Sequence, residues 1–293
     1  MFGLFSQKGN GLFFGLGTGR CGTMFFANVL SAHTDILCLH EGMRRDITTK
    51  GEALLDFLTL QNHAAYARPA EADSMFAKMR ASMPKIRKQQ RKKILGDIAY
   101  NYSPFVRSIH HQFPKAKIIY IYRNGIEFVR SVVTNAAPDP CPVGWQEHGR
   151  KQSREERYIA LGRLRPLPAD PISNQWQHMD VIAKNAWLWA ETNRIIQDAL
   201  KDIPNTNILT IKFEDFFADV DAGYRELVAF LGVDDAMPSV QELLHTHINT
   251  RSEKTLPTWD EWSDEMRKSF LCHAGDMMQN LGYDIAPPLS LAP

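Results

Sequence analysis

Apolar and polar residues along the chain alternate between the spacing of strands and that of helices. Residues 11–42 predict a strand over Leu12–Phe14, a glycine-rich turn, a helix over Met24–Leu30 and a second strand over Ile36–Leu39. A near-continuous β-prone run at Lys117–Tyr122 is typical of a strand that is covered on both faces of a parallel sheet. Strands of this kind, each followed by a helical segment, indicate an α/β architecture.

The same alternation continues through the rest of the sequence. Further strands are predicted at Ile94–Ile98 and Ile208–Ile211, and helices at 51–93, Pro104–Phe113 and Trp176–Leu200. Proline and charged residues are frequent in residues 134–175, which predicts an irregular insertion or lid. We therefore expect one α/β domain over residues 1–293, with three α/β/α layers around a central parallel sheet.

The composition is that of an ordinary globular protein, with 44% hydrophobic and 23% charged residues. A formal net charge of +1 gives the whole chain no attraction to nucleic acid or to an anionic membrane, so any site for a polyanion must be a local cluster. We expect no nucleic-acid partner. The most basic run, Lys85–Lys93, is interpreted as a solvated helix face.

No segment has the pattern of a targeting signal or of a transmembrane helix. Residues Met1–Asn10 carry one lysine and no long apolar core, unlike a signal peptide. No window approaches the roughly 18 consecutive apolar residues of a spanning helix. The cysteines are scattered and include no CxxC pair; they are Cys21, Cys38, Cys141 and Cys272. Reduced thiols and the lack of a signal predict a cytoplasmic protein.

The strongest local signal is the loop Gly15–Thr23, which lies between a predicted strand and a predicted helix. Glycines let the backbone turn sharply and bring successive N–H groups onto an anion, and the helix N-terminus adds roughly half a positive charge. Arg20 adds a full charge with a forked set of donors, and the hydroxyls of Thr18 and Thr23 can donate further hydrogen bonds. The loop therefore predicts a site for a phosphate-like group.

Two phosphate-binding motifs compete for this loop. The P-loop of nucleotide triphosphatases needs a Gly-Lys pair, which the loop lacks. The dinucleotide fingerprint GxGxxG fits Gly17, Gly19 and Gly22, and Glu41 follows about 20 residues later, where a ribose-binding acid is expected. An NAD(P)-dependent oxidoreductase is thus an alternative function, although Arg20 would crowd its pyrophosphate turn. A glycine-rich turn that binds no ligand is a further alternative.

Several segments resemble the sulfotransferases that use 3′-phosphoadenosine 5′-phosphosulfate (PAPS). Arg20–Met24 is similar to the family's 5′-phosphosulfate loop. Ile119–Gly125 is similar to its second signature, a strand that ends in Arg and then Asn or Asp, and Ser131 stands at the expected eight residues after the Arg. Ile211–Asp215 and Leu227–Gly232 resemble later family elements, so the resemblance spans most of the chain.

The resemblance implies a P-loop nucleotide-hydrolase-like sulfotransferase fold. It implies transfer of a sulfuryl group from PAPS to a hydroxyl or amine acceptor by in-line displacement, which releases adenosine 3′,5′-bisphosphate (PAP). No metal is expected, because a basic loop suffices to stabilise the charge on the leaving oxygens. In the family, the Arg and Ser that match Arg123 and Ser131 bind the 3′-phosphate. The implied nucleotide-binding residues are Gly19, Arg20, Cys21, Gly22, Thr23, Met24, Arg123 and Ser131, with Arg251 and Lys254 in a later basic loop.

Catalytic roles follow from the same resemblance. The loop looks most like those of the tyrosylprotein and carbohydrate branches, and a Glu at this offset is the base in the tyrosylprotein branch, which implies Glu41 here. Arg20 would stabilise the departing phosphate. His40 is the rival base, because imidazole has a suitable unperturbed pKa. Strand alternation predicts that only one of these two neighbours points into the cleft.

The sequence departs from the family pattern and leaves the acceptor open. Cys21 replaces a common Ser, Met24 a common Thr, Gly125 a frequent Pro and Ala99 a frequent Lys. These departures keep a third alternative, a non-catalytic nucleotide-binding homologue. Acceptor-site insertions are predicted at 43–93 and 134–175, which match no family motif and do not distinguish a carbohydrate from a phenol, a lipid or a peptide.

Overall fold

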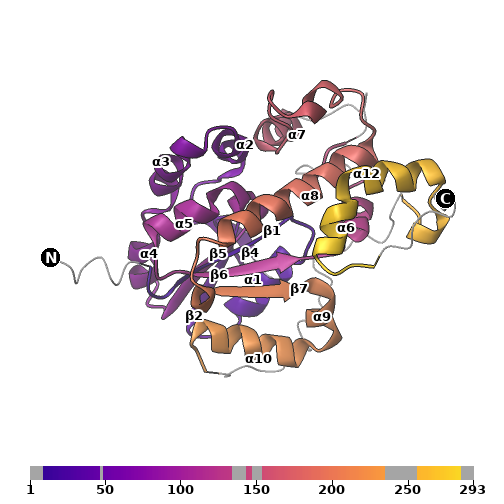
Figure 1. The fold of residues 1–293 in the computed structure, drawn as a ribbon. Helices are drawn as coiled ribbons and strands as arrows, with labels where there is room; N and C mark the ends of the chain where they lie inside the picture. Colours follow the sequence, from indigo (N-terminus) through magenta and orange to yellow (C-terminus); the bar gives the residue numbers. More distant parts are fainter. Residues whose placement is uncertain (1–8, 47–48, 134–142, 147–153, 235–255, 285–293) are drawn as a thin grey trace.

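The protein is built around one seven-stranded sheet (Figure 1). The computed structural model describes residues 9–46, 49–133, 143–146, 154–234 and 256–284. The strands are β1 (Leu12–Gly17), β2 (Ile36–His40), β3 (Met43–Asp46), β4 (Thr49–Ala53), β5 (Ile94–Ile98), β6 (Lys117–Tyr122) and β7 (Ile208–Lys212). They follow the order β4-β3-β2-β5-β1-β6-β7, so β1 lies between β5 and β6.

Five neighbouring strands, from β2 to β7 across the sheet, run parallel. At their carboxyl ends His40 pairs with Ile98, and Gly17 pairs with Ile121, so the segments after these strands emerge at one edge. Ligands of open α/β sheets bind in the crevice at this edge. β3 and β4 extend the sheet beyond β2 as an antiparallel hairpin.

Helices cover both faces of the sheet (Figure 1). In the described ranges the α-helices are α1 (Thr23–Ser31), α2 (Thr59–Ala67), α3 (Pro69–Arg80), α4 (Met83–Gln89), α5 (Val106–Gln112), α6 (Gly125–Val132), α7 (Arg154–Gly162), α8 (Val181–Leu200), α9 (Phe213–Ala218), α10 (Val220–Leu231) and α12 (Asp264–Asn280). Short 3₁₀ segments are η2 (Tyr100–Phe105), η3 (Pro171–Asn174), η4 (Asn205–Asn207) and η5 (Trp259–Glu261). None of the helices in these ranges has the length and apolar character needed to cross a membrane.

Strand β1 is buried along its whole length because its side chains serve both faces. Phe13 packs in a cluster with α1 and α10, whereas Phe14 faces α3 and η2, with its ring centroid 5.7 Å from that of Phe76 and 5.3 Å from that of Tyr102. A third cluster joins α6, α8 and α12 around Trp189. This packing fixes α1 and α6, the helices that follow β1 and β6.

The three-layer α/β fold and its mostly parallel sheet confirm the predicted fold class. The helix predicted over 51–93 is wrong at its start, because residues 51–53 belong to β4, which is held by backbone pairing and has no apolar pattern that would mark it. The long helix begins at Val181 instead of Trp176, where Asp180 caps it. The predicted irregular segment 134–175 contains α7. The extent of the domain over 1–293 stays a prediction.

The basic run Lys85–Lys93 covers the end of α4 and the turn after it. Lys85, Lys88 and Arg91 are exposed, as expected for a solvated face. Lys93 forms an ion pair with Asp35 at 2.6 Å between Nζ and Oδ2. The run therefore lies on the surface, where Lys93 ties it to the residues before β2.

Candidate functional site

The loop after β1 folds as a tight backbone turn that leads into α1. Gly19, Arg20 and Gly22 have positive φ angles of 76°, 53° and 83°. The left-handed conformation is strained for a non-glycine residue, so Arg20 is held there by its surroundings. At Gly22 a Cβ atom would lie 2.9 Å from the ring of Phe213, which makes glycine a packing requirement as well. Turns of this kind form concave backbone surfaces that suit anions.

The two sequence signatures meet at this loop. The Nε–H of Arg20 donates a hydrogen bond to the Ser131 hydroxyl at 2.9 Å, and one terminal N–H of Arg123 donates to the carbonyl oxygen of Arg20, also at 2.9 Å. Ser131 lies on α6, and Arg123 immediately follows β6. Because β1 and β6 are neighbours in the sheet, the loop after one strand contacts the helix after the other.

Arg123 is partly buried and is held by an aromatic ring and a carboxylate. Its guanidinium carbon lies 4.5 Å from the centroid of the Phe213 ring, and a terminal nitrogen lies 3.6 Å from a carboxylate oxygen of Glu127. Its Nε is buried and has no hydrogen-bond partner among the described residues. The side chain as a whole is 20% exposed, so part of it faces solvent while the Nε is buried.

Residues around the end of β6 fix the direction in which α6 leaves the sheet. The Asn124 side chain caps α6 by accepting the N–H groups of Ile126 and Glu127 at 2.8 and 3.2 Å. The indole N–H of Trp189 donates to the carbonyl oxygen of Arg123 at 3.0 Å. These bonds keep Ser131, which lies further along α6, facing the loop.

His40 is the last residue of β2, Glu41 follows it in a turn, and the two lie in different environments. His40 is 6% exposed, and its Nε2 lies 3.1 Å from the Thr23 hydroxyl at the start of α1. Glu41 and Gly42 have φ angles of 54° and 79° and join β2 to β3, as the two central residues of a type I′ hairpin turn require. Glu41 is only partly buried. Its backbone lies at the tip of the turn, at the carboxyl end of β2.

Cys21 contributes its backbone to the loop, whereas its thiol lies in the core. The side chain is fully buried, and its Sγ would lie 2.7 Å from a Cβ at Gly17. Burial raises the pKa of the Cys21 thiol to about 11, although the charge of Arg123 acts in the opposite direction. Met24 is half-buried on α1. The predicted contacts of Arg251 and Lys254 lie outside the described residues.

Three residues that support the site were not assigned to it from the sequence: Phe213, Asn124 and Trp189. An Asn directly before a helical segment is a known capping signal, so Asn124 could have been found. Phe213 begins α9 and Trp189 lies in α8, and both are far from Arg123 in sequence, with Trp189 at a separation of 66. No local pattern marks such contacts.

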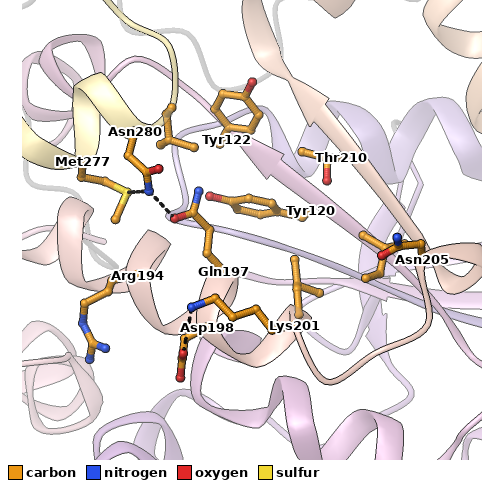
Figure 2. A pocket seen from close by; sticks show the side chains of 13 residues that line it. Tyr120, Tyr122, Arg194, Gln197, Asp198, Lys201, Asn205, Thr210, Met277 and Asn280 are labelled. Atoms are coloured by element: carbon orange, nitrogen blue, oxygen red, sulfur yellow. Dashed lines mark hydrogen bonds and ion pairs between the residues drawn. The ribbon is translucent and has the colours of Figure 1, made fainter.

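A hollow of about 830 Å³ lies elsewhere, between β6, β7, α8 and α12 (Figure 2). It lies at the edge of the sheet that β7 forms. The cations that line it are already paired: Arg194 with Glu191 at 2.6 Å and Lys201 with Asp198 at 3.3 Å. None of the candidate site residues that the structure describes lines it, so it differs from the candidate site at the loop.

Within the described ranges, no group of three or more His, Cys, Asp or Glu side chains is arranged to hold a metal ion. The loop brings together Arg20, Arg123 and the Ser131 hydroxyl, with the Glu127 carboxylate 3.6 Å from Arg123. Such a set suits a ligand that carries phosphate or sulfate groups.

The comparisons with known proteins agree with this geometry. Residues 13–158 match the family model described as "Sulfotransferase family". No curated protein matches the sequence. The branch of the family stays a prediction, because the match does not distinguish the tyrosylprotein and carbohydrate branches.

Solved structures share the fold at low sequence identity. The sulfotransferase domain from the curacin biosynthetic pathway is 15% identical with a TM-score of 0.52, covering 95% of this chain and 100% of that chain. The sulfotransferase domain of the Synechococcus PCC 7002 olefin synthase is 15% identical with a TM-score of 0.52, covering 95% of this chain and 97% of that chain. Sulfotransferase STF9 from Mycobacterium avium is 10% identical with a TM-score of 0.51, covering 97% of this chain and 80% of that chain. On the family match and this shared fold, the chain belongs to the sulfotransferase family.

Proposed function

We propose that this protein transfers a sulfuryl group from PAPS to a hydroxyl or amine of an acceptor and releases PAP. The observation that carries the proposal is the meeting of Arg20, Arg123 and Ser131 through two hydrogen bonds of 2.9 Å. These residues come from the two signatures that resemble the family's 5′-phosphosulfate and 3′-phosphate motifs. Their meeting supports one nucleotide site with an anion subsite at each end.

The 3′-phosphate subsite consists of Arg123 and Ser131. Arg123 offers the buried Nε–H that lacks an acceptor, together with a charge held against Phe213. The Ser131 hydroxyl accepts from Arg20, so its own proton can be donated to a phosphate oxygen. A cation and a hydroxyl donor together suit a phosphate dianion.

The 5′-phosphosulfate subsite consists of the loop Gly19–Thr23 and the Arg20 side chain. The left-handed turns at Gly19, Arg20 and Gly22 shape a concave backbone at the N-terminus of α1, whose dipole favours negative charge. In the reaction the bond between sulfur and the 5′-phosphate oxygen breaks, and a bond forms between sulfur and the acceptor oxygen. Arg20 stabilises the negative charge that remains on the PAP phosphate.

Glu41 is the residue we propose as the base that takes the acceptor proton. Its place at the tip of the β2–β3 turn supports this role, because that tip lies at the carboxyl edge of the sheet. His40 is 6% exposed and its Nε2 contacts the Thr23 hydroxyl, which supports a role in orienting the start of α1 instead. The oxidoreductase alternative assigns no role to Arg123 or Ser131.

We further propose that the protein acts in the cytoplasm. The cysteines in the described ranges, Cys21, Cys38 and Cys272, are free thiols, which suits a reducing compartment. The acceptor class stays open between a carbohydrate, a phenol, a lipid and a peptide. Departures from the family at Cys21 and Met24 do not remove the backbone N–H groups of the loop, which supports a working donor site.

The decisive experiment is calorimetric titration of the protein with PAP, NAD and NADP, followed by PAPS turnover. Of the three nucleotides, we expect only PAP to bind tightly. We also expect PAP to be released from PAPS with at least one of four acceptors: 2-naphthol, a glycan oligomer, a long-chain alcohol and a tyrosine peptide. The Glu41→Gln variant should bind PAP as tightly as the wild type and turn over far more slowly. Preference for a nicotinamide nucleotide would sink the proposal, and PAP binding without turnover would favour the non-catalytic alternative.

A further inference from the structure

Directly behind the Glu41–Gly42 turn lies a charged cluster that the nucleotide site does not use. It consists of Asp97 on β5, Tyr102 on η2 and Arg80 at the end of α3, and the Asp97 and Arg80 side chains are 0% and 1% exposed. Asp97 sits in the middle of the sheet, with its backbone opposite Leu39 of β2 and Phe14 of β1. Burying a carboxylate inside a sheet is costly unless it is paired and hydrogen-bonded, so its contacts indicate what it does.

The cluster is connected by short hydrogen bonds. The Tyr102 hydroxyl donates to Asp97 Oδ2 at 2.5 Å, and the Arg80 Nε–H donates to the Tyr102 oxygen at 2.6 Å. A terminal nitrogen of Arg80 lies 3.5 Å from Asp97 Oδ2. Burial raises the pKa of Tyr102 well above its ordinary value, so the phenol keeps the proton that it donates. One oxygen of Asp97 is thus fully engaged with the core.

The other oxygen of Asp97 reaches the turn. Asp97 Oδ1 accepts the backbone N–H of Gly42 at 2.9 Å, while the N–H of Glu41 donates to the carbonyl oxygen of Ile98 at 3.2 Å. The Gly42 carbonyl oxygen accepts the N–H groups of Leu54 and Leu55, each at 3.0 Å. The two residues of the turn are therefore tied to β5 on one side and to residues after β4 on the other.

Energetic considerations argue that this cluster serves more than stability. Replacing a buried ion pair with apolar residues of similar volume is often neutral or stabilising, so Arg80 and Asp97 are a weak source of stability. Glu41 also occupies a left-handed turn position that favours Asn, Asp or Gly. A strained residue persists only where the surrounding structure holds it in place. The buried ion pair and the left-handed Glu41 are both explained if the turn must be rigid and must carry a glutamate.

We propose that Asp97, supported by Tyr102 and Arg80, is a positioning residue that fixes the Glu41 carboxylate for proton transfer. This inference rests on the proposed role of Glu41 as the base. Asp97 touches neither nucleotide nor acceptor, and it acts through the Gly42 N–H. A shift of the turn by about 1 Å would lower turnover on the order of 100-fold while leaving the nucleotide site intact.

The test is a double-mutant cycle between Asp97→Asn and Glu41→Gln, read as PAP release from PAPS with 2-naphthol or with water as the acceptor. The Asp97→Asn substitution turns one carboxylate oxygen into an NH₂ group, which then faces the donors of Tyr102 and Arg80 or that of Gly42. We expect Asp97→Asn to lower kcat about 10- to 100-fold, with the KM for PAPS and the Kd for PAP within about twofold. In the Glu41→Gln background it should lower kcat by less than about twofold.

Equal losses in both backgrounds, or a parallel loss of PAP affinity, would overturn the inference, since either would mean a general structural role. Tyr102→Phe is the second variant in case Asp97→Asn does not fold, and Tyr120→Phe is its matched control, because that buried hydroxyl bonds to Asn193 on α8 instead. Amide exchange at Gly42, measured by NMR, should speed up in Tyr102→Phe and not in Tyr120→Phe.

This design separates the two proposals. If Glu41→Gln keeps full turnover, the proposed base is wrong, whatever Asp97 does. If Glu41→Gln turns over far more slowly than the wild type and Asp97→Asn and Tyr102→Phe are both fully active, the proposed base stands and the positioning role is wrong. If the wild type releases no PAP, the inference can still be tested by amide exchange. An unchanged exchange rate of the Gly42 N–H in both Asp97→Asn and Tyr102→Phe would show that Asp97 does not hold the turn.

Discussion

The guanidinium of Arg20 and the hydroxyl of Ser131 meet at 2.9 Å although 111 residues separate them in the sequence. The sheet order explains this, because β1 and β6 are adjacent and parallel, with Gly17 opposite Ile121. The loop after β1 and the helix after β6 therefore begin side by side. The proposed anion-binding surface therefore consists of residues from both segments.

The first prediction concerns Arg123. Arg123→Ala removes the cation held over Phe213 and the Nε–H that lacks an acceptor, so PAP affinity should fall about 10- to 100-fold, the usual value of a charge-assisted hydrogen bond. Arg107→Ala is the matched control, since Arg107 is exposed and paired with Asp198 and Asp202. Calorimetry with PAP measures both variants. Equal affinity in Arg123→Ala and the wild type would mean that the 3′-phosphate binds elsewhere.

Much of this arrangement can be predicted from the sequence because it depends on local patterns. The apolar run from Leu12 and the β-prone run Lys117–Tyr122 predict both strands, although β1 continues to Gly17, three residues into the predicted loop. It does not predict the β3–β4 hairpin, because the strands of this hairpin are held by backbone bonds and their polar residues do not alternate with apolar ones.

Contacts between segments that are distant in the sequence could not be predicted, because no local pattern marks them. The Phe213 ring under Arg123 follows β7, and Asp97 reaches Gly42 only because β5 pairs with β2. The choice between His40 and Glu41 also depends on such contacts, since the Thr23 hydroxyl that engages His40 lies on α1. Alternation along β2 does not decide between them, because β2 ends at His40 and Glu41 lies in the left-handed turn after it.

The second prediction is a trade between stability and activity at Glu41. Its φ of 54° favours Asn, so Glu41→Asn should raise the free energy of unfolding by about 0.5–1 kcal/mol and abolish PAPS turnover. Arg91→Asn is the control, because Arg91 has a φ of 52° in the turn after α4 and should gain similar stability with normal turnover. Urea unfolding and PAP release measure the two effects. A loss of stability in Glu41→Asn would show that the carboxylate itself holds the turn.

The third prediction concerns Gly125, which stands where the family pattern that the sequence resembles frequently has proline. Gly125 is the first residue of α6, a position that usually favours proline. Here its N–H donates to the Met278 sulfur at 3.3 Å, and an added Cβ would lie 2.9 Å from the Trp189 indole. Gly125→Pro should therefore destabilise the protein by about 1–3 kcal/mol through overpacking.

Its control is Asp264→Pro, at the first position of α12. Asp264 is exposed, and the preceding Ser263 has φ −66° and ψ 161°, which proline accepts. Asp264→Pro should change the free energy of unfolding by less than about 0.5 kcal/mol. Urea unfolding compares the two variants. Equal stability of the two proline variants would mean that Trp189 moves aside at no cost.

The fourth prediction concerns the Cys21 thiol. Burial disfavours the thiolate and raises the pKa to about 11, so at pH 8 about one thiol in a thousand is ionised. Iodoacetamide at pH 8 should alkylate the exposed Cys272 rapidly and leave Cys21 unmodified, as mapped by mass spectrometry. Modification of Cys21 should increase only as the pH approaches 11 or the protein unfolds. Rapid labelling of Cys21 at pH 8 would mean that the loop opens and exposes the thiol to solvent.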